Sequence, residues 1–289
     1  MGIVSRLREL RARYGLRRGL ARELGLLRAR LLDRVTASRL ACDLAALGVR
    51  RGDVVFVHTA LSRIGHVVGG PAAVIRAIEA AVGPTGTVLM PAYSTGGLPY
   101  DWVIEKTVFD VRRTPADVGA VPETFRLLPG TRRSLHPTHS VCARGAKADV
   151  VTEGHERSVR PFGPGTPFAK LAELGGKGVL LGARLRNFTA LRIVEDGLEE
   201  AYPVRVYCPA PFAIDVIDAA GARRTVRTLV PDPAWSRRRD GDLLLPGLRA
   251  RGLVTEGTVG RAPTLVVDCA RLLDALEDLT ARGVLAYRA

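Results

Sequence analysis

Two short apolar runs separated by a helical stretch, between residues 53 and 91, restrict the possible folds more than any other feature of the chain. Residues 53–58 (DVVFVH) and 87–91 (TVLMP) are bounded by polar residues and glycine, which is typical of buried strands. Between them, Pro71 occupies the favoured first position of a helix that extends to Val82. A strand–helix–strand unit with short loops predicts parallel strands with helices packed on the faces of the sheet.

The rest of the chain continues this pattern on both sides of the first unit. A helix through Leu40, Leu44 and Leu47, capped by Thr36 or Ser38, precedes it. Further elements of the same kind are expected as helices at 117–128, 189–200 and 269–282, and as strands at 178–182 and 264–269. Alternating runs at 204–208, 213–218 and 225–230 predict antiparallel strands or an excursion from the main sheet. The expected fold is α/β: one domain, residues 36–289, with a central, mostly parallel sheet flanked by helices.

The first 35 residues have a different character and predict a basic helical extension. Leu20, Leu24, Leu27 and Leu31 follow one another at intervals of four, three and four, which places them on one helical face. Residues 1–40 hold eleven Arg against three acidic residues, a net charge of +8 out of +14 for the chain. The helix either packs on the main body or a second subunit, or docks an acidic carrier protein or an anionic membrane surface.

Composition removes several classes of function. A net charge of +14 would suggest nucleic acid as a partner, but much of the excess lies in the extension and aromatic residues make up only 5%. No apolar run reaches the roughly 18–20 residues of a membrane span, and no secretory signal is recognisable at the N-terminus. The cysteines are widely spaced, without a CxxC pair, at positions 42, 142, 208 and 269. We therefore expect a cytoplasmic protein with free thiols and no nucleic-acid partner.

Polar residues gather where predicted strands run into glycine-containing loops, the usual place for sites in open α/β sheets. The run from His58 to Ser62 leads to Gly69 and Gly70, directly before a helix. Backbone amides in such a turn suit a phosphate. The glycine spacing matches neither a dinucleotide fingerprint nor a P-loop, and a purely structural turn is the alternative reading.

A denser cluster lies at residues 132–140 (RRSLHPTHS), with two His, two Arg and two Ser. Pro137 restricts the backbone of His136 and so presets its direction. The His136-x-x-His139 spacing has no third ligand at a recognisable interval, so we expect no metal site. One of the two imidazoles is expected to be structural and hydrogen-bonded to a backbone carbonyl.

Three further features complete the set. Residues 161–168 (PFGPGTPF) form a rigid loop with an apolar wall. Arg192 and Glu195 are three residues apart on one helical face, and the alternative to a site is an ordinary helix salt bridge. Glu123 is either a site carboxylate or an acid favoured in the first turn of a helix.

In this order, the clusters resemble the aminoglycoside 3-N-acetyltransferase family, also called antibiotic N-acetyltransferases. The matching segments lie between about residue 40 and residue 202: GVRRGDVVFVHTALSRIG, VVGG, AVGPTGTVLMPAYS, FDVRRTPADVGAVPETFR, RSLHPTHSV, FGPGTPF and LLGARLRNFTALRIVEDG. The resemblance implies an α/β fold of that family's type, acetyl-coenzyme A as donor, a small-molecule amine as acceptor and no metal. A base would deprotonate the acceptor nitrogen for attack on the thioester, and backbone or hydroxyl donors would hold the oxyanion.

The resemblance also implies which residues contact the coenzyme. They are the residues that match the family's glycine turn, its RSxHPxxS motif and its PFGPGTPF loop: His58, Thr59, Leu61, Ser62, Val68, Gly69, Gly70, Ser134, Ser140, Phe162 and Phe168.

The chain departs from the family at the position of the expected base. The family motif ends in L-H-x-x-E, and this chain has Arg192 in place of the His. Arginine is not deprotonated in proteins, so it cannot act as a base. The candidates for the base are then His136, His139, His66 and Glu195, and Glu123 is a further candidate carboxylate. Arg192 is expected at the same site, but not as the base.

The same arginine bears on the acceptor. An aminoglycoside is a polycation that prefers a carboxylate-lined cleft, whereas an added Arg suits an anionic group. We therefore expect a divergent, coenzyme A-dependent acyltransferase that N-acetylates a small molecule or a biosynthetic intermediate. The alternatives are a member that acts on an acyl thioester bound to a carrier protein, and an inactive binding or partner subunit.

Overall fold

The computed structural model describes residues 34–94, 97–105 and 108–288. The predicted basic helix, together with its proposed docking role, therefore lies outside the described residues. Of the extension, the structure describes Arg34 and Val35, which form strand β1 (Arg34–Val35) and pair in parallel with β3 (His66–Val67). No helix within the described ranges is long and apolar enough to cross a bilayer.

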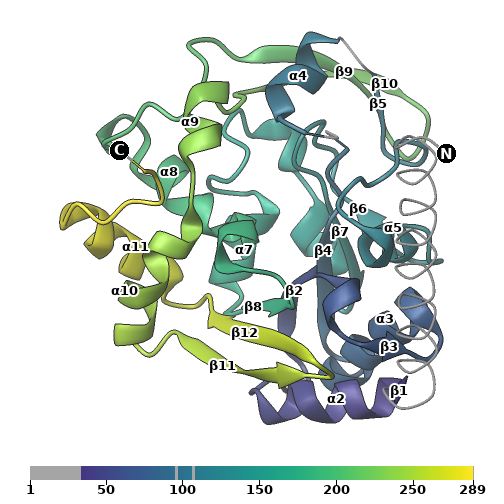
Figure 1. Ribbon diagram of the computed structural model, residues 1–289. Helices are drawn as coiled ribbons and strands as arrows, with labels where there is room; N and C mark the ends of the chain where they lie inside the picture. The colour runs from purple at the N-terminus through teal and green to yellow at the C-terminus, as the bar shows by residue number, and fades with distance from the viewer. Residues whose placement is uncertain (1–33, 95–96, 106–107, 289) are drawn as a thin grey trace, which may run out of the picture.

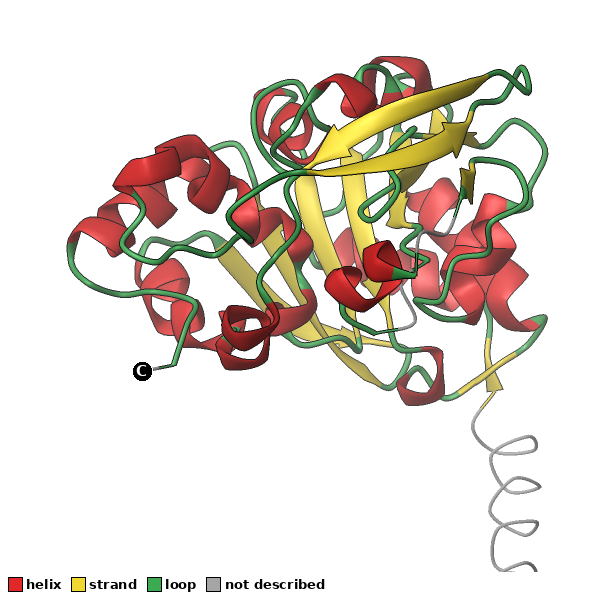
Figure 2. Ribbon diagram, turned by 90° about the horizontal axis from the view of Figure 1, so that it is seen from above, coloured by secondary structure: helices red, strands yellow, loops and turns green. Residues whose placement is uncertain are grey.

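In the described part of the chain, seven strands form the central sheet (Figures 1 and 2). Their order across the sheet is β11 (Val254–Val259), β12 (Ala262–Asp268), β8 (Lys177–Leu181), β2 (Val54–Thr59), β4 (Thr87–Pro91), β7 (Val141–Gly145) and β6 (Arg132–Arg133). Strand β2 pairs in parallel with both β4 and β8, and the outer pairs are antiparallel. The predicted α/β domain, with parallel strands at the centre of its sheet, is thereby confirmed.

Side chains that alternate along β2 divide the core into two layers. Val55 and Val57 belong to a buried cluster with helices α2 (Ala37–Ala46), α3 (Gly70–Val82) and α5 (Ala120–Arg126). Val54 and Phe56 belong to a second cluster on the other face, because successive side chains of a strand point to opposite sides. The helices of that second layer are α6 (Ala148–Thr152), α7 (Pro167–Glu173), α8 (Ile193–Leu198), α10 (Leu245–Ala250) and α11 (Leu272–Ala281).

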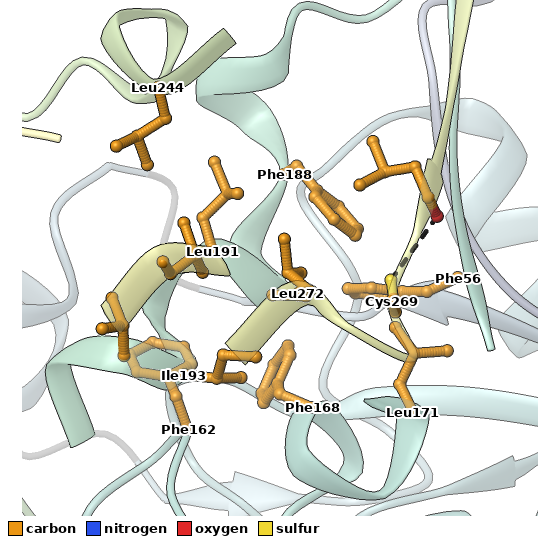
Figure 3. Packing of buried hydrophobic residues seen from close by; sticks show 14 of the residues in the cluster. Phe56, Phe162, Phe168, Leu171, Phe188, Leu191, Ile193, Leu244, Cys269 and Leu272 are labelled. Carbon is orange, nitrogen blue, oxygen red and sulfur yellow. Dashed lines mark hydrogen bonds between the residues drawn. The ribbon is translucent and has the colours of Figure 1, made fainter. Parts of the chain in front are cut away.

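Phenylalanine rings lie among aliphatic side chains in the second layer (Figure 3). Phe168 lies edge-on to Phe56 and to Phe162, with ring centroids 5.7 and 5.1 Å apart, respectively. Leu191 and Ile193 belong to the same buried cluster and flank Arg192 in the chain. Burial of these two side chains holds the backbone that carries the arginine in place. Each fully buried side chain of this kind stabilises the fold by roughly 1.5–3 kcal/mol.

A separate three-stranded sheet lies beside the main one, with strands in the order β10 (Arg223–Thr228), β9 (Phe212–Ile217) and β5 (Phe109–Asp110). The antiparallel pairing of β9 and β10 confirms the alternating pattern seen in the sequence. Helix α4 (Pro99–Ile104) packs on this sheet through Trp102 and Val103. The strand expected at residues 204–208 is wrong, since only an isolated bridge from Tyr207 to Pro231 forms there.

The continuous helix expected at residues 189–200 is also wrong. The segment is divided into a 3₁₀ turn (Thr189–Arg192), α8 and a second 3₁₀ turn (Glu199–Ala201). Glu199 has a φ of 49°, which an α-helix does not allow, and this ends α8. The break matters for the site, because the first 3₁₀ turn carries Arg192.

Candidate active site

A cavity of about 240 Å³ lies at the carboxyl edge of the parallel strands. Its walls come from the loop after β4, the segment before β7, the turns after β8 and the residues around α9 (Pro233–Arg238). Strand β7 begins at Val141, which pairs with Pro91 at the end of β4, so the residues before β7 lie at the same edge. Of the residues predicted for catalysis, His139 and Arg192 line this cavity.

His139 is a neutral imidazole on the cavity wall. Burial, together with the charge of Arg192, lowers the pKa of His139 well below 6.5. Its Nδ1 lies 2.9 Å from Thr138 Oγ1. The ring packs edge-on against Phe162 and against Tyr93, with centroids 4.7 and 5.4 Å away.

His136 has a different environment and is fully buried. Its Nδ1 accepts from the backbone N–H of His139 at 3.1 Å, and its Nε2 lies 3.1 Å from Thr228 Oγ1. The ring stacks on His155 at 4.3 Å. Burial, with the neighbouring imidazoles, lowers the pKa of His136 well below 6.5. His136 is buried and held by internal partners, as expected of a structural imidazole, but these are a backbone N–H and a hydroxyl and not the expected backbone carbonyl.

Arg192 and Glu195 form the ion pair that their spacing indicates. The Nη2 of Arg192 lies 3.0 Å from Glu195 Oε2, and Glu195 Oε1 accepts from Tyr287 Oη at 2.8 Å. Burial opposes the charge of Arg192, but the Glu195 carboxylate and the neighbouring tyrosines raise its pKa above the ordinary value. The guanidinium also lies over the ring of Phe162, 4.9 Å from the centroid. Glu195 thus faces Arg192 and Tyr287 at a side chain that is 1% exposed, which leaves it poorly placed to act as a base. Its Oε2 has an ion-pair contact but no hydrogen-bond partner among the described residues.

Two further arginines at the cavity were not found from the sequence. Arg239 Nε lies 3.4 Å from Glu195 Oε1, and Arg239 and Arg186 both line the cavity. Arg239 lies some 50 residues beyond the motif, in a segment without a recognisable pattern. Arg186 lies inside a matched segment, but its direction depends on the 3₁₀ turn Leu185–Asn187.

Glu123 lies outside this cavity, in the first turn of α5. Its carboxylate accepts from Arg126 Nε at 2.7 Å and from the backbone N–H of Ala116 at 2.8 Å. The hydrogen bond from Arg126 holds the pKa of Glu123 below its usual range. Of the two readings of Glu123, the geometry favours the helix acid.

The serines predicted for the coenzyme are buried, and their hydroxyls have partners inside the protein. Ser134 Oγ accepts from the N–H of Val141 and lies 2.9 Å from His155 Nδ1. Ser140 Oγ donates to the carbonyl of Ala92 at 2.7 Å. These bonds fix the segment before β7, and a contact of either serine with the coenzyme stays a prediction.

The predicted coenzyme residues of the first loop fall into two groups. His58 is buried between the rings of Phe56 and Phe188, where burial lowers its pKa to about 3. The other group is accessible to solvent at least in part: Thr59, Leu61, Ser62, Val68, Gly69 and Gly70. None of these seven residues lines the 240 Å³ cavity.

Phe162 and Phe168 are fully buried in the core beneath the site. Phe162 supports both His139 and Arg192, as the ring distances above show, and Phe168 packs behind it. Their aromatic faces position other side chains. His66, in β3, does not line the cavity. Within the described ranges, no group of three or more His, Cys, Asp or Glu side chains is arranged to hold a metal ion.

A central α/β sheet with a polar cavity at the carboxyl ends of its parallel strands defines a class of proteins with a ligand site at that edge. A family model described as aminoglycoside 3-N-acetyltransferase matches residues 56–281. The chain belongs to this family, which confirms the resemblance seen in its sequence.

Individual relatives agree with this assignment. Aminoglycoside N(3)-acetyltransferase VII of Streptomyces paromomycinus is 34% identical over 263 residues, covering 83% of this chain and 89% of that protein. The solved aminoglycoside acetyltransferase AAC(3)-Xa superposes with a TM-score of 0.75 and 33% identity, covering 87% of this chain and 94% of its own. AAC-IIIb, solved as a binary complex with CoASH, gives a TM-score of 0.71 and 30% identity, covering 89% of this chain and 100% of its own.

Proposed function

We propose that the chain transfers the acetyl group of acetyl-coenzyme A to an amine of a small molecule, with His139 as the general base. Membership of the family supports the reaction, and the relative solved with CoASH supports the donor. The observation that carries the residue assignment is that His139 lines the cavity beside Arg192, whereas His136 and Glu195 are held by internal partners.

The lowered pKa of His139 keeps the imidazole neutral at pH 7 but also makes it a weaker base, because a general base works best with a pKa near the operating pH. The assignment therefore rests on the position of His139 at the cavity wall. When Nδ1–H donates to Thr138 Oγ1, the lone pair of Nε2 is free for the acceptor. The amine nitrogen then bonds to the thioester carbonyl carbon as the C–S bond breaks, and His139 carries the proton from the nitrogen to the departing thiolate.

The glycine turn before α3 has the features needed for the phosphates of the donor. Gly69 and Gly70 adopt φ values of 88° and 57°, and Gly69 caps a 13-residue helix. A Cβ on Gly69 would lie 3.3 Å from Arg76 Nη2, so a cation borders the turn. Amides at a helix N-terminus beside a guanidinium favour a phosphate. The sequence-based assignment of Gly69 and Gly70 to the coenzyme is part of this proposal.

The decisive experiment is turnover of acetyl-coenzyme A with a panel of amines, followed by release of free thiol. We expect thiol release that depends on both substrates and a mass gain of one acetyl group on the amine. An absence of release, with a melting temperature that coenzyme A does not change, would instead support a non-catalytic binding subunit. Neither the described residues nor the relatives support the alternative of a carrier-bound acyl thioester.

A further inference from the structure

The cavity has an unusual charge for a site that accepts an amine. Three guanidinium groups line it, those of Arg186, Arg192 and Arg239, and we call this set the arginine wall. No Asp or Glu is among the described residues that line the cavity. A protonated amine would therefore meet repulsion unless another part of the same molecule carried negative charge.

Two of these guanidinium groups retain buried donors without a partner. The side chains of Arg192 and Arg239 are only 10% and 9% exposed. Arg192 Nε and Arg239 Nη2 are buried, and neither has a hydrogen-bond partner in the described part of the structure. Glu195 Oε2, an acceptor 3.0 Å from Arg192 Nη2, is also buried without a hydrogen-bond partner in the described part of the structure, so one acceptor stands against two unpaired donors. A buried charged donor left unpaired is costly, so this excess of donors favours an additional acceptor at the site.

The carboxylates behind the wall do not balance it. Glu195 contacts both Arg192 and Arg239, so one negative charge serves two positive ones. The neighbouring Asp196 accepts from Tyr207 Oη and from the backbone N–H of Phe162, both at 2.7 Å. Burial raises the pKa of Asp196 to about 6, so this carboxyl stays mostly ionised at pH 7 and loses its charge only as the pH falls below about 6. In direct contacts, Glu195 alone faces both Arg192 and Arg239, which leaves fewer carboxylates than guanidinium groups at the cavity.

We propose that the arginine wall binds an anionic group, a carboxylate or a phosphate, on the amine acceptor. This inference rests on the proposed function, whose substrate class it narrows. Guanidinium groups bind both kinds of oxyanion through charge-assisted hydrogen bonds. Arg192 and His139 both contact the ring of Phe162, so the guanidinium and the imidazole lie close together. An acceptor whose anionic group binds Arg192 can therefore place its amine next to the His139 imidazole.

The volume of the cavity also bears on the kind of acceptor that it can hold. The cavity of about 240 Å³ is smaller than the roughly 300–1,000 Å³ of pockets for drug-sized ligands. A volume of this order accommodates a small acceptor such as an amino acid or an amino-sugar phosphate.

The first test compares matched acceptors that differ only in charge. The pairs are 6-aminohexanoate with 6-aminohexanamide, and glucosamine 6-phosphate with glucosamine, each with acetyl-coenzyme A and a free-thiol readout. We expect kcat/KM to be roughly 10–100-fold higher for the anionic member of at least one pair, since hydrogen bonds between charged groups are worth about 1.5–3 kcal/mol. The pair with the larger ratio identifies the oxyanion. Equal or higher activity on the neutral members overturns the proposal.

The second test measures anion binding without the reaction. Inorganic phosphate and acetate, at constant ionic strength set with chloride, are titrated calorimetrically into the full chain. The double variant is Arg192→Gln with Arg239→Gln, which removes both guanidinium groups that carry unpaired donors and leaves Glu195 with the hydrogen bond from Tyr287. The matched control is Arg113→Gln, whose side chain is 90% exposed.

We expect binding by the wild type and by Arg113→Gln, and at least a tenfold weaker affinity in the double variant. Binding that the double variant retains, or that the wild type lacks, overturns the inference. Anion binding without acetyl transfer to any amine would instead leave the anion site standing and reject the proposed function.

Discussion

Two polar clusters lie at the same edge of the sheet. They differ in whether their polar atoms find hydrogen-bond partners inside the protein. The imidazole cluster consists of His136, His155, Ser134 and Thr228, and its ring nitrogens contact groups inside the protein. The arginine wall, in contrast, includes two buried donors, Arg192 Nε and Arg239 Nη2, that have no hydrogen-bond partner among the residues that the structure describes. A polar cluster that satisfies itself stabilises the fold, whereas one that does not indicates a ligand.

The chemistry of the two side chains explains the difference. Burial lowers the pKa of His155 to about 3, so the ring becomes neutral and needs no counter-ion. A buried arginine has no such option, because its guanidinium keeps its proton. Arg192 and Arg239 must therefore be balanced by carboxylates, and Glu195 alone contacts both. Burial therefore leaves the imidazole cluster complete, whereas Arg192 and Arg239 keep donors without a partner among the described residues.

The largest effect is expected from His139→Gln, which removes the imidazole between the two clusters. We expect kcat for acetyl transfer to fall by about 100–10,000-fold, the usual contribution of a positioned general base. The melting temperature should change little, since the glutamine amide can keep a contact to Thr138. Steady-state kinetics with the free-thiol readout measures the loss.

The control for this variant is His66→Gln, whose imidazole does not line the cavity. This variant should retain the activity of the wild type. An active His139→Gln enzyme would show that another group takes the proton and would remove His139 from the mechanism.

Acid should destabilise the protein through its neutral imidazoles. The folded-state pKa of His58 and of His155 is about 3, against 6.5 in the unfolded chain, and burial lowers the pKa of His136 and His139 in the same direction. Below pH 6.5 the unfolded chain therefore binds more protons, so stability is full above pH 6.5 and is lost as the pH falls towards 3. Asp196, whose pKa is about 6, opposes this loss between about pH 6 and pH 4.

Urea unfolding at pH 7.5 and pH 5.5 measures the balance. Each imidazole contributes about 1.4 kcal/mol per pH unit inside its window, so four of them outweigh one carboxyl. We expect the free energy of unfolding to fall by on the order of 4 kcal/mol. Equal values at the two pH values would mean that the buried imidazoles are solvated or paired in the folded state.

The sequence predicts the fold and the motif residues better than it predicts the two polar clusters. The central strands and helices follow from periodicity, and β4 spans the predicted residues 87–91. His139 and Arg192 were identified because they belong to local motifs. His155 and Arg239 reach their clusters through long-range packing, and no local pattern indicates their partners. Short-range signals thus predict elements and motif residues, whereas the closure of a polar network depends on contacts distant in sequence.

Ser134→Ala tests whether the imidazole cluster is structural. The change leaves the buried N–H of Val141 and Nδ1 of His155 without their partner, at a cost of about 1–3 kcal/mol. We expect this loss in urea unfolding, with the KM for acetyl-coenzyme A unchanged. A raised KM at unchanged stability would instead support the predicted contact between Ser134 and the coenzyme.

Arg186→Gln is expected to have the smallest effect on the KM for the acceptor, because Arg186 is the most exposed member of the arginine wall. Its side chain is 46% exposed, and Asp242 lies 3.9 Å from its Nε. A solvent-screened pair of this kind is worth about 0–1 kcal/mol, so the KM for an anionic acceptor should rise only a few-fold. Arg239→Gln, at a side chain that is 9% exposed, should raise the same KM by more. If Arg186→Gln raised this KM by more than Arg239→Gln, the anionic group of the acceptor would bind near the exposed Arg186. The unpaired donors of Arg192 and Arg239 would then not explain how the acceptor is recognised.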